Sequence, residues 1–72
     1  MGGIPKLLDV VALTDDLPER ALYRGQVGTV VEVLGGDILE VEFNDDQGRT
    51  YACVPLQAAK LMTLLYQPGQ VA

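Results

Sequence analysis

Apolar and polar residues alternate most regularly over residues 38–43, where the chain reads ILEVEF. Successive side chains of a β-strand point to opposite faces, so this alternation predicts a strand with one face in a core. The apolar face runs from Leu39 to Phe43, and the opposite face carries Glu40 and Glu42. We therefore expect the two glutamates to face solvent.

Four more segments are short, rich in β-branched or aliphatic residues and bounded by turn formers, which predicts strands. They cover residues 8–14, 26–34, 49–54 and 61–65. Pro55 is predicted to end the fourth strand of the chain, because proline cannot donate to a sheet. The intervening segments predict a long loop at 15–25 with a helical turn starting at Pro18, tight reversals at 35–37 and 44–48, and one helical turn within 56–60.

Five short strands, two tight hairpins and a helical turn before the last strand predict an all-β domain, a small five-stranded SH3-like (KOW-like) barrel. The 72 residues allow one domain over 1–72, with an ordered core of about 7–66 and frayed ends. The predicted core residues are Val11, Leu13, Val41, Phe43 and Cys53.

The composition argues against catalysis. The chain has no histidine and one cysteine, so it lacks the commonest general base and cannot build a multi-cysteine metal site or an internal disulfide. We predict no catalytic residues, no cofactor and no metal. The oxygen-rich turn at 44–48 does not have the ligand spacing of a calcium loop and is interpreted as a hairpin.

Gly25 and Gly28 lead from the long loop into β-branched residues. No Gly-Lys-Ser/Thr follows, and no third glycine opens a helix, so a phosphate-binding loop is disfavoured. We interpret Gly28 as a backbone requirement at a sharp bend, where a side chain would force strained geometry.

The net charge is −5, from ten acidic and five basic side chains, and the basic residues are scattered. A nucleic-acid binder usually concentrates Lys and Arg on one face, so nucleic-acid binding is disfavoured. An acidic surface suits a basic protein partner, and exposed tyrosines can anchor it. We expect one negative face rimmed by tyrosines, and a solvated surface that only maintains solubility is the alternative. The candidate partner-binding residues are Tyr23, Arg24, Glu40, Glu42, Asp45, Asp46 and Tyr51.

The N-terminus lacks a basic region followed by an apolar stretch, and no apolar run approaches the roughly 20 residues of a membrane helix. We therefore expect neither a signal peptide nor membrane insertion. A lone cysteine also fits a reducing compartment. The expected location is the cytoplasm.

The segments GQVGTVV (25–31), LEVEF (39–43) and GRTYA (48–52) carry a family resemblance. With the opening DVVALT, they resemble a widespread group of short bacterial proteins, common in cyanobacteria, that is classed as a domain of unknown function. The match extends over 9–65. It implies no catalytic residues, and such genes often look like the second of a pair beside a small nuclease-like or toxin-like protein.

The charge of −5 and the absence of catalytic chemistry predict a non-catalytic protein-binding module, and the resemblance implies an antitoxin or immunity role toward such a neighbour. The chain also looks, more distantly, like small SH3-like accessory subunits of photosynthetic electron-transfer complexes and like the KOW module of ribosomal and transcription factors. An accessory subunit of an electron-transfer or other enzyme complex is therefore the alternative function. A nucleic-acid role ranks third, because the basic residues that KOW modules use are mostly missing.

Overall fold

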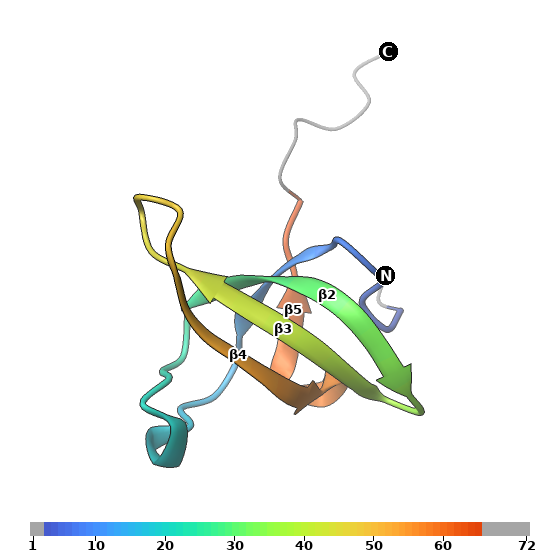
Figure 1. Ribbon diagram of the computed structural model, residues 1–72. Coiled ribbons are helices and arrows are strands. Elements are labelled where there is room, and N and C mark those ends of the chain that lie inside the picture. The colour runs from blue at the N-terminus through green and yellow to red at the C-terminus, as the bar shows by residue number, and fades with distance from the viewer. Residues whose placement is uncertain (1–2, 66–72) are drawn as a thin grey trace.

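The fold is one curved antiparallel sheet of five strands (Figure 1). It is given by a computed structural model that describes residues 3–65. The sheet order is β4-β3-β2-β1-β5. The strands are β1 (Val10–Leu13), β2 (Val27–Gly35), β3 (Ile38–Asn44), β4 (Thr50–Gln57) and β5 (Leu61–Thr63), with the 3-10 turns η1 (Pro18–Arg20) and η2 (Ala58–Lys60).

The predicted all-β class, the five strands and the helical turn before the last strand are confirmed. Closure into an SH3-like (KOW-like) barrel stays a prediction, because β4 and β5 end the sheet and no ladder joins them within residues 3–65. The expected tail at 66–72 lies outside the described residues.

The strand β1 is shorter than predicted because the chain turns immediately before it. The N–H of Asp9 donates to the carbonyl of Lys6 over 2.9 Å, and the Asp9 carboxylate accepts from the Lys6 N–H over 2.8 Å. Leu8 has a positive φ of 70° in this turn. The predicted first strand therefore loses residues 8 and 9.

The prediction that Pro55 ends a strand is wrong, because β4 continues through it to Gln57. In the part of the chain that the structure describes, β4 lies at the edge of the sheet and pairs only with β3, so a proline nitrogen can face away from the ladder. Its neighbour in register across the ladder is Glu40.

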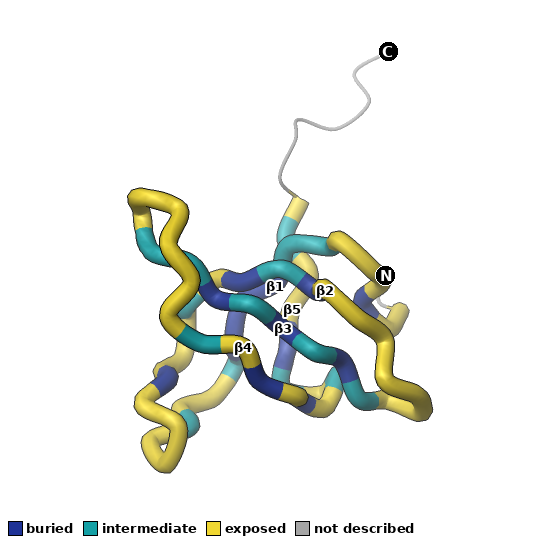
Figure 2. The backbone as a smooth tube through the Cα atoms, viewed as in Figure 1, coloured by how far each residue is buried: buried dark blue, intermediate teal, exposed yellow. Residues whose placement is uncertain are grey.

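The core lies on one face of the sheet, where buried residues alternate with partly exposed ones along β3 (Figure 2). The predicted burial of Val11, Leu13, Val41 and Phe43 is confirmed, and that of Cys53 is wrong. The thiol is exposed because Cys53 pairs with the outward residue Glu42. The remaining members of the core cluster are Leu22, Val30, Leu39, Val54, Leu56 and Leu61.

Candidate functional site

Three glutamates lie together on the outer face of β2 and β3. Glu32 and Glu40 are direct cross-strand neighbours, and Glu42 follows two residues later on the same face of β3. A register shift at residue 31 of β2 brings Glu32 opposite Glu40. We call Glu32, Glu40 and Glu42 the acidic face.

Two polar groups of β4 approach the acidic face from the neighbouring strand. The Thr50 hydroxyl donates to Glu42 Oε2 over 2.9 Å, and the Cys53 thiol donates to Glu40 Oε2 over 3.2 Å. Neither group carries a positive charge. The hydrogen bonds orient the carboxylates and leave their charge in place.

No basic side chain compensates the acidic face within residues 3–65. The two ion pairs there join Arg49 to Asp45 and Lys60 to Asp15, at 3.3 and 3.1 Å. Like charges directly opposite each other on a sheet are unfavourable. The acidic face is therefore a concentration of negative charge that the folded domain maintains against repulsion.

Asp45 holds the β3–β4 turn together through its carboxylate. Its Oδ1 accepts the backbone N–H groups of Gln47 and Arg49, each over 2.9 Å, and its Oδ2 pairs with the Arg49 side chain. The backbone N–H of Arg49 is the largest cause of a pKa of Asp45 below its ordinary value. Asp46 is exposed in the same turn and keeps its place as a candidate.

The two candidate tyrosines are linked through Gln26. The N–H of Tyr23 donates to Gln26 Oε1 over 2.6 Å, and Gln26 Nε2 donates to the Tyr51 hydroxyl over 3.1 Å. About half of each tyrosine is exposed, at 49% and 47%. Gln26 carried no signal in the sequence, because its role depends on two segments that are 25 residues apart.

Tyr51 does not rim the acidic face. The Tyr51 ring centroid lies 6.3 Å from that of Phe43, whose side chain points into the core. Tyr51 therefore lies on the core side of the sheet, away from the outward glutamates. Arg24 is exposed near Tyr23, and its backbone N–H donates to Asp16 Oδ1 over 2.9 Å. Tyr51 and the two glutamates Glu40 and Glu42 therefore lie on different faces of the sheet.

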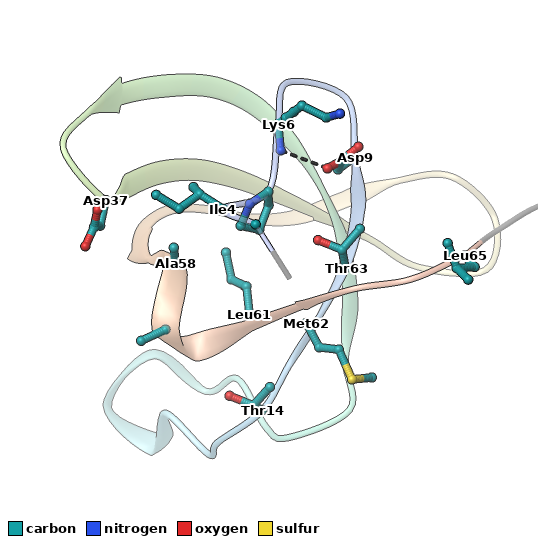
Figure 3. Close-up of a pocket in the computed structure, with 13 residues that line it drawn as sticks. Ile4, Lys6, Asp9, Thr14, Asp37, Ala58, Leu61, Met62, Thr63 and Leu65 are labelled. Atoms are coloured by element: carbon teal, nitrogen blue, oxygen red, sulfur yellow. Dashed lines mark hydrogen bonds between the residues drawn. The ribbon is translucent and has the colours of Figure 1, made fainter. Parts of the chain in front are cut away.

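A groove of about 1000 Å³ lies elsewhere, between the N-terminal segment, the β2–β3 turn and the η2–β5 segment (Figure 3). Its lining is mainly apolar and includes Ile4, Leu61, Met62 and Leu65. None of the seven candidate partner-binding residues lines it. The groove and the acidic face are therefore separate features.

Residues 7–63 match the family model described as a domain of unknown function, DUF4926. The chain belongs to the DUF4926 family. No curated protein and no solved structure matched the chain. The family match confirms the resemblance found in the sequence, and it assigns no activity to this DUF4926 domain.

Other features of this DUF4926 domain concern metals and membranes. Within residues 3–65, no three Cys, Asp or Glu side chains are grouped so that they could hold a metal ion. The same part of the chain contains no helix that is long and apolar enough to cross a membrane.

The Cys53 thiol is expected to react slowly with alkylating agents. Its hydrogen bond to the Glu40 carboxylate raises the pKa of the thiol, and desolvation and the Glu42 charge raise this pKa further. A raised pKa lowers the thiolate fraction, and the thiolate is the nucleophile. Glu40→Gln should therefore speed alkylation below the thiol pKa, as measured by iodoacetamide rates between pH 7 and 10.

The control for this prediction is Glu19→Gln, which removes the same charge in the exposed β1–β2 loop. It should leave the pH profile of alkylation unchanged. The hydrogen bond between Cys53 and Glu40 would be contradicted if the alkylation rate of the parent rose with pH around the ordinary thiol pKa. It would also be contradicted if the pH dependence of this rate were identical in Glu40→Gln and the parent.

Proposed function

We propose that this domain is a non-catalytic protein-binding module whose acidic face binds a basic partner. The observation that carries the proposal is the cross-strand pairing of Glu32 with Glu40, with Glu42 beside them and no compensating Lys or Arg in residues 3–65. Uncompensated like charges lower stability, so a partner that supplies Lys or Arg side chains gains from relieving the repulsion.

Charge also acts before contact. A net charge of −5 on 72 residues attracts a basic protein over distances of a Debye length, about 8–10 Å at moderate salt. This attraction raises the rate of association with a basic protein. The same negative charge repels nucleic acid. It favours a protein partner over the KOW-like alternative.

The finer proposal is that the partner is a small nuclease-like toxin encoded beside this gene in a bacterium, and that the domain is its cytoplasmic antitoxin. A nuclease carries basic groups that bind phosphates, and a row of carboxylates can occupy those groups. The family resemblance supports this pairing, and the lack of histidine fits a role without catalysis.

The alternative is an accessory subunit of an electron-transfer or other enzyme complex. The apolar groove favours it, because Ile4 is 53% and Leu65 is 94% exposed at its lining. Permanent interfaces are more apolar than transient ones. A tight, salt-resistant complex through this groove would support the alternative.

The test is binding to the product of the neighbouring gene at low and high salt. The double variant Glu40→Lys with Glu42→Lys should weaken binding at low salt by about tenfold or more, because it reverses two charges that the partner faces. High salt should weaken the parent complex similarly.

The matched control is Glu19→Lys with Asp37→Lys, which makes the same change in net charge at exposed positions outside the acidic face. It should weaken binding much less. Binding that survives both high salt and reversal of Glu40 and Glu42 would end the acidic-face proposal. A neighbour that does not bind the parent at all would end the antitoxin proposal.

A further inference from the structure

The outer edge of β4 is an unpaired strand edge beside the acidic face. Among the described residues 3–65, the strand pairs with β3 on one side only, and it ends the sheet. Within residues 3–65, none of the backbone hydrogen bonds made in turns and loops involves a residue of Thr50–Leu56. Such an edge can accept one more strand.

Pro55 shows which backbone groups point outward. Proline has no N–H, so its pair with Glu40 is of the type that exchanges no ladder hydrogen bonds. These pairs alternate along a ladder, so Cys53, paired with Glu42, is of the same type. The N–H and C=O of Cys53 and the C=O of Pro55 therefore face the open edge, and Gln57 follows the same alternation.

The side chains along β4 define what an added strand would touch. Cys53 and Pro55 lie on the outer face beside Glu42 and Glu40, and both are short. Val54, between them, points into the core and is 9% exposed. Residues of an added strand that lie opposite Cys53 and Pro55 would share the acidic side, and the residue between them would lie on the apolar side.

We propose that the open edge of β4 takes up an extended segment of the partner as a sixth strand, in which Lys or Arg alternates with apolar residues. This inference rests on the proposed function and deepens it. The basic side chains extend over Cys53 and Pro55 to Glu42 and Glu40, which lie one strand further in. Because Pro55 offers no donor, pairing is centred on Cys53, which offers both a donor and an acceptor.

The first experiment uses two end-blocked nonapeptides made of five lysines and four valines. In one the residues alternate, and in the other the lysines precede the valines in a block. The alternating peptide should shift the NMR signals of the Cys53 and Gln57 amides and slow the hydrogen exchange of both. It should bind at least about fivefold more tightly than the block peptide, since only the alternating order matches a strand.

Equal binding of the two peptides would overturn the proposal. So would unchanged exchange of the Cys53 amide at saturating peptide, or no binding at millimolar peptide. Protection of the Cys53 amide that persists in the Glu40→Lys, Glu42→Lys double variant would overturn the acidic role on which the proposal rests, while showing that the edge itself pairs.

The second experiment separates the backbone from the charge. Cys53→Pro removes the outward donor without changing the charge, and the ladder with β3 does not use that N–H. It should weaken binding of the alternating peptide about three- to tenfold, the effect of one hydrogen bond. Cys53→Ala keeps the N–H and loses the same thiol, so it is the reference against which the affinity of Cys53→Pro is compared. Equal affinity of a folded Cys53→Pro variant and Cys53→Ala would overturn the proposal.

Discussion

Replacing Leu22 by alanine is expected to lower the free energy of unfolding by about 2–5 kcal/mol. Leu22 lies in the β1–β2 loop, yet it is 1% exposed and belongs to the core cluster. The substitution removes buried methyl groups and leaves a cavity that the surrounding strands cannot fully close. A domain of 72 residues is expected to have about 4–11 kcal/mol of total stability, so the loss is a large part of it.

The measurement is urea unfolding followed by circular dichroism, with Leu7→Ala as the matched control. Leu7 is 55% exposed, so the same truncation there should change the free energy of unfolding by no more than about 0.5 kcal/mol. Similar losses for the two variants would show that the loop does not dock on the core as described.

Leu22 illustrates what the sequence could not predict. The strand at 38–43 follows from local alternation, which its burial shows in every position, and the other strands follow from β-branched content between turn formers. The burial of Leu22 depends instead on a loop that folds back on itself. Leu17 and Leu22 exchange backbone hydrogen bonds of 2.7 and 3.1 Å around η1, and Ala21 takes a left-handed conformation there. Nothing in the periodicity of the loop indicates that contact.

The candidate site could also be predicted only where it depends on the local pattern within one strand. The shared face of Glu40 and Glu42 follows from the two-residue period of a strand. The position of Glu32 opposite Glu40 required the register shift in β2, which the sequence did not indicate. The prediction that Cys53 is buried was wrong. The apolar neighbours Ala52 and Val54 do not indicate which face of the sheet Cys53 lies on, whereas the pairing of Cys53 with Glu42 places it on the outer face.

Gly28 is expected to be the least replaceable glycine, for a reason that differs from the sharp bend predicted from the sequence. It lies inside the sheet, paired with Val11 on one side and Phe43 on the other. A Cβ atom at Gly28 would lie 2.8 Å from the Glu42 carbonyl oxygen and 2.8 Å from Val41 Cγ1. The requirement is a close approach of two strands, and the neighbouring oxygen belongs to the backbone of β3.

Gly28→Ala should therefore lower the free energy of unfolding by about 1–3 kcal/mol, the usual effect of overpacking, and Gly28→Val should lower it at least as much. Gly3→Ala is the control, because a Cβ there meets nothing within 4 Å. Both are compared with the parent by urea unfolding. Gly28→Val should be no more stable than Gly28→Ala, since valine adds bulk where β2 and β3 are already in contact. A Gly28→Ala protein as stable as the Gly3→Ala control would show that the strands can separate without loss. A Gly28→Val protein more stable than Gly28→Ala would show that strand propensity outweighs the contact.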